Sequence, residues 1–388
     1  MSEEKLTLKQ ERIKLFRDAT ANKRTYRTPH RSYFTTWILF DAGYRLVDSV
    51  ANYANHADAA RKHYELYKWD GCGFGITCNY AMSQALGTNW YNYDMEADAI
   101  SCVDQPVLHN FDEYREFIAN PKKVIYEKWM SRKYPAFRDD MDPALIDNAI
   151  RVRDEYFAAN AQISKMADEY EVPPMSGGMA PINPLEYMID YYTGIKGMPI
   201  LMRRDPGLFK DFCNALNDYH CEPMYRMLEN APEGPNMNLA FDGNVMLLAH
   251  SFLNEKQFDE YYWPYIGRGL HCFTDKNKTC HIQLQAHGRR FFDHLQDMQN
   301  GLLDLQPELD SPFEVRKILP NMCLSAGVSL NKLGHDTPEV CADEARKILT
   351  ELGDQGLILT QDKMGAYPND CIRENLLAVC KVVQEFRR

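Results

Sequence analysis

Apolar positions recur along the chain with two periods, one typical of helices and one typical of short strands. Residues 4–22 alternate charged and apolar side chains at helical spacing. Residues 143–170 do the same over a longer stretch, with apolar side chains from Ile146 to Ile163 close to a 3.6-residue period. Both stretches predict amphipathic helices in an outer layer of the fold.

The second half of the chain alternates short apolar runs with amphipathic stretches. Strands are predicted at residues 238–241, 279–283, 301–305, 322–324 and 357–360, with helices between them that include residues 338–352 and 372–386. This alternation predicts a parallel sheet covered by helices, and five such units favour a closed barrel over an open sheet. We therefore expect an α/β fold, a single (β/α)8 TIM barrel with an N-terminal helical extension, in which residues 1–388 form one domain.

Composition narrows the class of partner. The 388 residues are 45% hydrophobic and 26% charged, which suits one large core, and no apolar run approaches the length of about 20 residues that spans a bilayer. The first residues lack the apolar segment of a secretion signal, so we expect a soluble, cytoplasmic protein whose 11 cysteines are reduced thiols. The net charge of −11 argues against nucleic acid, and the chain has neither a dinucleotide-binding glycine motif nor a P-loop. The partner is therefore a small molecule, another protein, or both.

Several motifs resemble the uroporphyrinogen decarboxylase superfamily, in the same order from near residue 35 to the C-terminus. Residues 180–188 (APINPLEYM) look like the family's Ala-Pro-aromatic-Thr-x-x-x-Tyr-Met segment, and residues 84–87 (QALG) look like the motif after its second strand. Residues 241–243 (FDG), followed by Phe258 and Pro264, resemble a unit of the family's methyltransferase branch. The resemblance implies the same barrel fold.

The residues that define a decarboxylase are mostly replaced. Phe40 and Tyr44 stand where the family has two arginines, Cys78 where it has an aspartate, and Met364 where it has a histidine. Of that set only Tyr187 is retained. Because a substrate with many carboxylates needs guanidinium groups to hold it, the resemblance points away from decarboxylation and toward the methyltransferase branch.

The zinc motif of that branch, His-x-Cys with a later Cys, is only partly present. His281 occupies the histidine position, but Gln283 and Lys363 stand where or near where the two cysteines would be. Activation of a thiol by zinc needs soft sulfur ligands, so a thiol-methylating enzyme is not expected. What remains is demethylation, in which a methylated substrate gives its methyl group to the Co(I) corrinoid of a partner protein.

An aryl methyl ether is the preferred substrate, because its aryl oxide must be protonated or coordinated as it leaves. The candidate catalytic residues are Tyr187, His281 and Asp242. The candidate substrate-binding residues are Phe40, Tyr44, Cys78, Tyr80 and Met364. The alternative to acid assistance is a metal ion such as zinc, for which His281, Glu308 and Asp362 are the candidate ligands. The strand limits predict that Asp242, His281, Glu308 and Asp362 lie at the C-terminal ends of barrel strands.

Structural roles for the same residues stay open. His281 follows an apolar run, so a packed structural histidine is the alternative to a catalytic role. Asp242 precedes Gly243, so its alternative role is in a turn or a helix cap. For Glu308 the alternative is a solvated loop residue. Two other functions also stay open, a decarboxylase of the same fold and a barrel that binds a ligand without catalysis. A homodimer is a further open possibility, since the sequence does not fix the oligomeric state.

Overall fold

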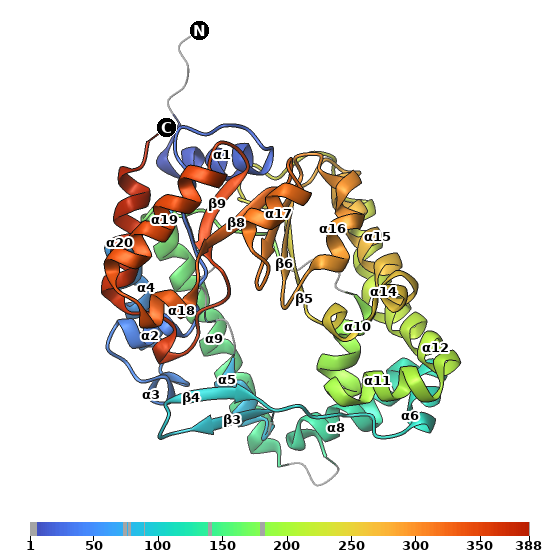
Figure 1. Cartoon of the computed structure of the whole chain (residues 1–388). Helices are drawn as coiled ribbons and strands as arrows, with labels where there is room; N and C mark the ends of the chain where they lie inside the picture. The colour runs from blue at the N-terminus through green and yellow to red at the C-terminus, as the bar shows by residue number, and fades with distance from the viewer. Residues whose placement is uncertain are drawn as a thin grey trace.

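The central element is a five-stranded parallel sheet in the second half of the chain. The computed structural model describes residues 6–72, 76, 79–88, 90–138, 142–178 and 183–387. The strands stand side by side in chain order: β5 (Gly243–Leu247), β6 (Cys280–Leu284), β7 (Leu303–Pro307), β8 (Cys323–Val328) and β9 (Leu357–Gln361) (Figure 1). Strands β6, β7 and β9 are buried at every position, which explains their continuous apolar runs.

Parallel pairing continues beyond both edges of this sheet. Strand β1 (Arg31–Ser32) pairs in parallel with β2 (Gly71–Cys72), and His30 next to β1 bridges Leu359 of β9. At the other edge Ser176 bridges Phe241, just before β5. The described residues include no hydrogen-bonded pair that joins β2 to the Ser176 segment. The fold is thus mixed α/β and compatible with a TIM-like arrangement, while closure into a barrel of eight stays a prediction.

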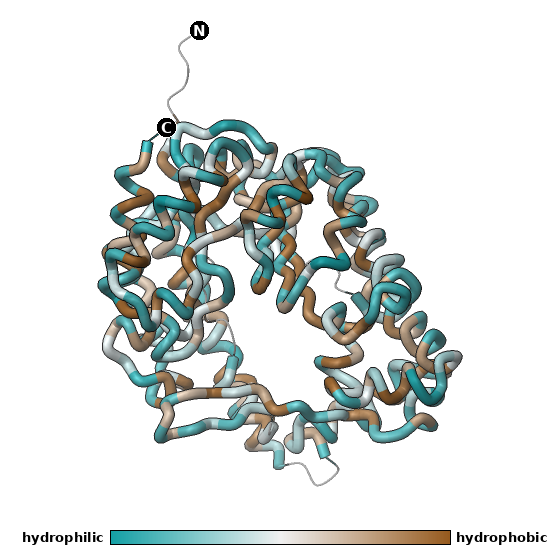
Figure 2. Tube along the Cα trace, in the orientation of Figure 1, coloured by the Kyte–Doolittle hydropathy of each residue, from teal (hydrophilic) through white to brown (hydrophobic). Residues whose placement is uncertain are grey.

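Helices cover the outside of the sheet between successive strands. They are α14 (Glu255–Tyr261), α15 (Trp263–Thr274), α16 (Arg289–Leu295), α17 (Pro312–Ile318), α18 (Leu330–His335), α19 (Pro338–Leu352) and α20 (Arg373–Glu385). Helix α19 shows why its sequence folds this way: the Thr337 side chain accepts a hydrogen bond from the Val340 backbone N–H, and Pro338 takes the first helical position. Its apolar positions face inward and its charged positions face solvent, an alternation visible along the helices in Figure 2.

The first half of the chain contributes mostly helices. The remaining helical elements are α1 (Leu8–Thr20), α2 (Trp37–Asp41), α3 (Leu46–Ser49), α4 (Tyr53–Tyr67), α5 (Tyr80–Ala85), α6 (Phe111–Ala119), α7 (Pro121–Val124), α8 (Met130–Lys133), α9 (Pro143–Glu169), α10 (Pro184–Tyr187), α11 (Gly194–Arg204), α12 (Pro206–Leu216) and α13 (Glu222–Glu229). Helical turns of other types lie at η1 (Ile125–Trp129), η2 (Pro135–Phe137), η3 (Met188–Tyr192), η4 (Asn217–Cys221), η5 (Ala249–Phe252), η6 (Gln296–Met298) and η7 (Pro368–Asp370). Strands β3 (Tyr91–Asp94) and β4 (Ala99–Cys102) form an antiparallel hairpin.

Helix α1 covers the N-terminal ends of the central strands. Phe16 and Ala19 pack on Phe241, just before β5, and on the first residues of β8 and β9. The Arg17 guanidinium donates to Asp242 and to the Leu239 carbonyl oxygen. The helix predicted near the N-terminus is confirmed as α1, and it covers the N-terminal ends of the central strands.

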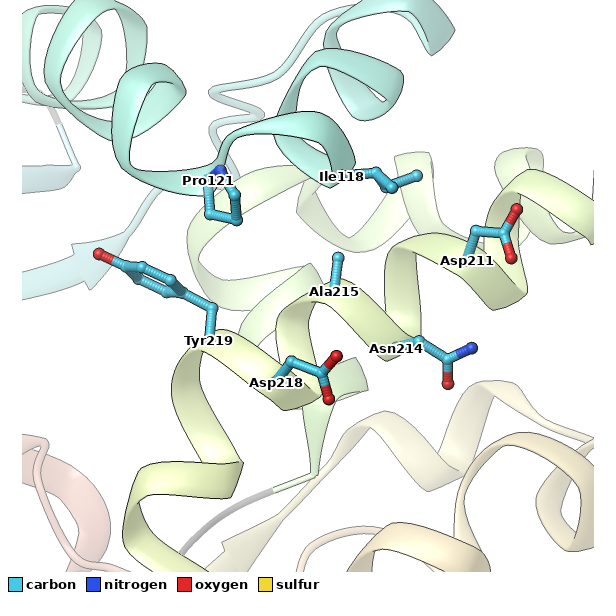
Figure 3. A pocket seen from close by; sticks show the side chains of 7 residues that line it. All are labelled: Ile118, Pro121, Asp211, Asn214, Ala215, Asp218 and Tyr219. Atoms are coloured by element: carbon cyan, nitrogen blue, oxygen red, sulfur yellow. The ribbon is translucent and has the colours of Figure 1, made fainter.

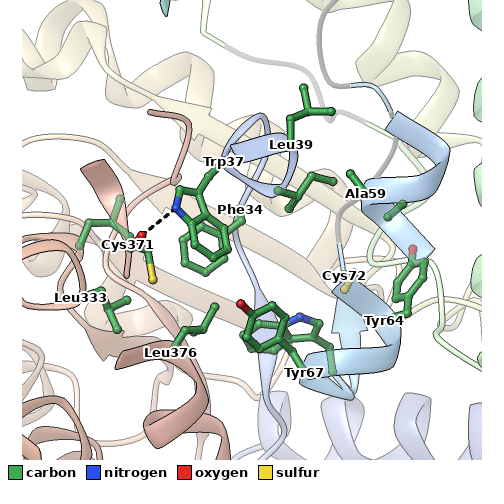
Figure 4. Close-up of a cluster of buried hydrophobic side chains, with 14 of the residues drawn as sticks. Phe34, Trp37, Leu39, Ala59, Tyr64, Tyr67, Cys72, Leu333, Cys371 and Leu376 are labelled. Atoms are coloured by element: carbon green, nitrogen blue, oxygen red, sulfur yellow. Dashed lines mark hydrogen bonds between the residues drawn. The ribbon is translucent and has the colours of Figure 1, made fainter. Parts of the chain in front are cut away.

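A second packing centre joins the N-terminal helices to the C-terminal ones. The Trp37 and Phe34 rings pack at a tilt of 36° with 4.4 Å between their centroids, and the Trp37 indole N–H donates to the Cys371 carbonyl oxygen at 3.0 Å (Figure 4). Tyr67 and Leu376 lie in the same cluster. This core fixes α2 and α4 against α20, and so fixes the position of β1 beside β9.

The predicted elements can now be compared with the observed ones. The helices at 143–170, 338–352 and 372–386 and the strands at 279–283, 301–305, 322–324 and 357–360 are confirmed to within a few residues. The predicted strand at 238–241 is wrong, since β5 begins at Gly243. Ala240 and Phe241 are buried in a connection that packs against α1, and they do not belong to a strand. No helix in the described part of the chain is both long and apolar enough to cross a membrane.

Candidate functional site

A cavity of about 240 Å³ lies at the centre of the parallel arrangement. Strands β1, β5 and β6, the Ser176 segment and the turn after β9 surround it. Its lining residues are Arg31, Ser32, Tyr33, Phe34, Thr35, Met175, Ser176, Phe241, Asn244, Met246, His281, Gln283 and Met364. The wall thus combines five large apolar side chains with a concentrated polar group, the composition expected of a small-molecule site.

The polar group is a connected network across β1, β6, β7 and β8. Arg31 Nη1 lies 3.1 Å from His281 Nε2, and His281 Nδ1 lies 2.6 Å from Asp304 Oδ2. The Ser325 hydroxyl also donates to Asp304 Oδ2, at 2.7 Å. His281 and Asp304 are directly paired in the β6–β7 register, so both side chains project to the same face of the sheet. The strands themselves therefore set the geometry of this network.

The network fixes the tautomer of His281. A guanidinium is always protonated and can only donate, so His281 Nε2 accepts from Arg31 and the ring proton lies on Nδ1, facing the Asp304 carboxylate. Burial and the neighbouring charge of Arg31 lower the pKa of His281 below its ordinary value, while Asp304 opposes this. His281 is consequently neutral, and its only proton points away from the cavity.

Tyr33 lies next to Gln361 and to Gln283, the residue that stands where the zinc motif has its first cysteine. Its hydroxyl donates to Gln283 Oε1, and its backbone N–H donates to Gln361 Oε1 at 2.7 Å. Burial raises the pKa of the Tyr33 phenol to about 12. Zinc on His281 Nε2 would have to displace a guanidinium that donates to the same nitrogen. The residues present do not fit a metal ion at this position.

The three predicted metal-binding residues are not brought together as a ligand set. Within the described ranges, no group of three His, Cys, Asp or Glu side chains is arranged to hold a metal ion. Glu308 and Asp362 do follow the C-terminal ends of β7 and β9, as predicted. Asp362 Oδ1 accepts from the backbone N–H groups of Leu330 and Lys363, and burial raises the pKa of both carboxyls. Asp362 thereby caps the start of α18.

The predicted position of Asp242 is wrong. It precedes β5 and so lies at the N-terminal end of the strand, under α1. Its carboxylate accepts from Arg17 at 2.8 Å and from the backbone N–H groups of Thr279 and Asn236. The pKa of Asp242 is lowered because the hydrogen bonds and the charge of Arg17 outweigh its burial. This set of contacts is structural, and it lies outside the residues that line the cavity. The predicted position of His281 at the C-terminal end of its strand is wrong as well, because His281 is the second residue of β6 and lies deep in the sheet.

Tyr187 lies in the helical layer and not among the residues that line the cavity. Its ring stacks on His220 at 4.3 Å with an interplanar angle of 10°, and its hydroxyl lies 4.0 Å from Met224 Sδ. Burial raises the pKa of the phenol to about 12. Tyr187 is thus not among the residues that line the cavity with His281, and the acid role predicted for Tyr187 stays a prediction.

Of the predicted substrate-binding residues, Met364 lines the cavity. Phe40 packs against the cluster that contains Trp37 and Leu376, and the Tyr44 hydroxyl donates to Asp58 of α4 at 2.8 Å. Tyr80 begins α5 and packs edge-on against Tyr91 of the hairpin, at 4.8 Å between centroids. Cys78 lies outside the described residues. Met364 and the predicted catalytic residue His281 are therefore the two predicted site residues among those that line the cavity.

A larger hollow of about 420 Å³ lies on the surface of the helical layer. Figure 3 shows Asp211, Ala215 and Asp218 along one helix facing Ile118 and Pro121. None of its lining residues belongs to a strand of the central sheet. We take the inner cavity as the candidate site, because it gathers buried polar groups from several strands.

Arg31, Tyr33, Asp304 and Gln306 are site residues that the motifs did not indicate. The signal that could have found two of them is the pattern of β7, where Asp304 and Gln306 interrupt a buried apolar strand at alternate positions. Alternation places both on the face that carries His281 and Gln283. A buried acid in a strand core calls for a partner, and His281 is that partner.

Comparison with known proteins supports the fold. No protein-family profile matches the chain, and no curated protein sequence matches it significantly. Among solved structures, a methyltransferase from Methanosarcina mazei superposes with a TM-score of 0.61 over 98% of this chain and 99% of that one, at 14% sequence identity. The two chains share a fold. The likeness extends over both chains end to end, so the helical first half belongs to the shared architecture as well as the sheet.

Proposed function

We propose that the chain is a methyltransferase that takes the methyl group of an aryl methyl ether and passes it to the Co(I) corrinoid of a partner protein. The observation that carries this proposal is the small central cavity with apolar walls, in a fold shared with a methyltransferase. Phe34, Phe241 and Met364 are suited to hold an aromatic ring. A cavity of about 240 Å³ lies below the range of about 300–1,000 Å³ typical of sites for larger ligands. This size favours a single ring over a porphyrinogen, the substrate of the decarboxylase alternative.

In the reaction the bond between the methyl carbon and the ether oxygen breaks, the methyl carbon bonds to the cobalt acceptor, and the aryl oxide leaves with the electron pair. A phenol has a pKa of about 10, so the departing oxygen needs stabilisation near neutral pH. The Tyr33 hydroxyl is the candidate donor inside the cavity. Because burial raises the pKa of Tyr33 to about 12, the hydroxyl keeps its proton. With substrate bound, that proton would turn from Gln283 Oε1 to the aryl oxide and stabilise it by a hydrogen bond. Solvent then protonates the released product.

The test is methyl transfer by the purified chain to free cob(I)alamin under anaerobic conditions, with 4-methoxyphenol as the donor. We expect a rise in methylcobalamin absorbance with matching release of hydroquinone. Met364→Trp should abolish transfer because the larger ring fills the cavity. Tyr44→Phe should not change it, because Tyr44 lies outside the cavity, between α2 and α3, with its hydroxyl on Asp58 of α4. If ethers, amines and thioethers all fail as donors, the proposal is wrong and a ligand-binding role without catalysis replaces it.

Two tyrosines compete for the donor role, and one comparison separates them. Tyr33→Phe should slow transfer by about 100-fold, the usual cost of removing one donor to a developing oxyanion. If the reaction takes place in the cavity, Tyr187→Phe should leave the rate within about twofold of the wild type. If Tyr187 is the acid, as the motifs predict, the variant should instead be slower while its substrate binding stays nearly intact. The reverse pattern would move the reaction from the cavity to the helical layer around His220.

A further inference from the structure

Arg31 brings an unpaired positive charge into the cavity wall. Its side chain belongs to a residue that is only 4% exposed, and its two contacts, His281 Nε2 and Gln306 Oε1 at 3.1 Å each, are both neutral acceptors. Among the described residues no carboxylate lies within ion-pair distance of this guanidinium. A guanidinium has five N–H groups, so three are left without an acceptor in the described chain.

The guanidinium is held in place from behind. His281 is fixed by Asp304, and the Gln306 amide donates to the carbonyl oxygens of Gln361 and Asp362 at 2.9 and 3.2 Å. The Tyr33 ring covers one face, with Arg31 Cζ 4.9 Å from its centroid. The Asp304 carboxylate contacts the other nitrogen of the His281 imidazole and makes no ion pair with Arg31. A buried charge without a direct counter-ion is costly, and a bound anion would offset that cost.

The depth of Arg31 sets which part of a substrate it meets. His281 is the second residue of β6, whereas Gln283 and Met364 lie nearer the C-terminal ends of the strands. Helix α1 covers the N-terminal ends, so a partner protein approaches from the C-terminal side. A methyl group within reach of that partner lies toward the C-terminal ends of the strands. The opposite end of the aromatic ring then lies toward Arg31, deeper in the cavity.

We propose that Arg31 is a receptor for a carboxylate, and that the substrate is an aromatic acid whose methoxy group lies at the opposite end of the ring. A guanidinium binds a carboxylate through two parallel N–H donors, a geometry that an amide or hydroxyl cannot reproduce. The identity of the methyl donor rests on the proposed function, but the carboxylate site rests on Arg31 alone.

The experiment measures binding of 4-methoxybenzoate and its neutral analogue 4-methoxybenzamide to the wild-type protein by calorimetry. We expect the acid to bind at least about tenfold more tightly than the amide. Arg31→Met should reduce the ratio of the two affinities to about one. Arg31→Lys keeps the charge but lacks the two parallel N–H donors of a guanidinium, so it should give an intermediate ratio. The exposed Arg289→Met is the matched control and should leave the preference unchanged.

Equal binding of acid and amide by the wild type overturns the inference without any variant. An unchanged preference in a folded Arg31→Met protein does so as well. The two proposals fail separately. Methyl transfer from the amide as fast as from the acid would overturn only the carboxylate site, whereas tight, Arg31-dependent binding of the acid with no methyl transfer would overturn only the methyltransferase function.

Discussion

His281 and Asp304 form one buried unit, with 2.6 Å between Nδ1 and Oδ2 at paired positions of β6 and β7. Asp304 is completely buried, and one of its oxygens, Oδ1, has no hydrogen-bond partner among the described residues. The pair orients the imidazole so that Nε2 meets the Arg31 guanidinium. A positive and a negative charge are thus linked through a neutral ring, and the ring sets the distance between them.

This arrangement predicts how His281 titrates. Arg31→Met removes a positive charge that lowers the pKa of His281, while the opposing influence of Asp304 remains. The pKa of His281 should therefore rise in the variant. Side-chain nitrogen NMR should show the midpoint moving upward, and in the wild type it should show the Nδ1–H tautomer at neutral pH. An unchanged midpoint, or an Nε2–H tautomer, would contradict the proposed direction of these hydrogen bonds. Arg289→Met should leave both properties as they are.

Asp242 should matter for stability and not for chemistry. It and Arg17 form a largely buried ion pair at the covered end of the sheet. Asp242→Asn leaves the Arg17 charge without its partner, and breaking a buried pair costs about 3–5 kcal/mol of unfolding free energy. Urea denaturation measures this loss, and the rate of methyl transfer per folded molecule should stay unchanged. A matched control is Asp293→Asn in the exposed pair with Arg289, where we expect a loss below about 1 kcal/mol.

Periodicity predicted the elements of the second half well, because β6, β7 and β9 are buried at every position and α18 and α19 begin at side-chain caps that the sequence shows. The site was predicted less well for two physical reasons. Motif alignment carries residues over by their place along the chain, but Tyr44 and Tyr187 point into helix contacts that alignment cannot show. Arg31 was missed because it belongs to a two-residue strand, too short to give a periodic signal.

Buried neutral histidines should make the fold sensitive to acid. Burial lowers the pKa of His30 to about 3 and that of His250 to about 4. The unfolded chain takes up these protons near pH 6.5 and the folded chain does not, so the free energy of unfolding falls as the pH drops from 7 to 5, by about 2 kcal/mol for each histidine.

Chemical denaturation at pH 7 and pH 5 measures that slope. His30→Phe should remove the contribution of one histidine to this pH dependence. A phenylalanine suits the position, because His30 packs edge-on against Trp69 and its Nε2 has no hydrogen-bond partner in the described chain. The exposed His287→Gln is the control and should keep the wild-type slope. A slope that His30→Phe leaves unchanged would mean that His30 is already protonated in the folded state.

Lys133 should make the free energy of unfolding rise with pH on the alkaline side as well. Its residue is 4% exposed, and its ammonium lies 3.0 Å from the centroid of Trp90 and 4.5 Å from that of Trp129. Burial lowers the pKa of Lys133 to about 7, with Asp190 partly opposing the shift. An unfolded lysine has a pKa of about 10.4, so between pH 7 and pH 9 the unfolded chain holds a proton that the folded chain has released. The wild type should therefore gain about 2 kcal/mol of unfolding free energy over this range relative to Lys133→Met.

Paired denaturation curves of the two proteins cancel the contributions of other groups, and the exposed Lys123→Met should show no such pH-dependent difference. A constant difference between wild type and Lys133→Met would mean that the aromatic rings hold the lysine as a cation throughout.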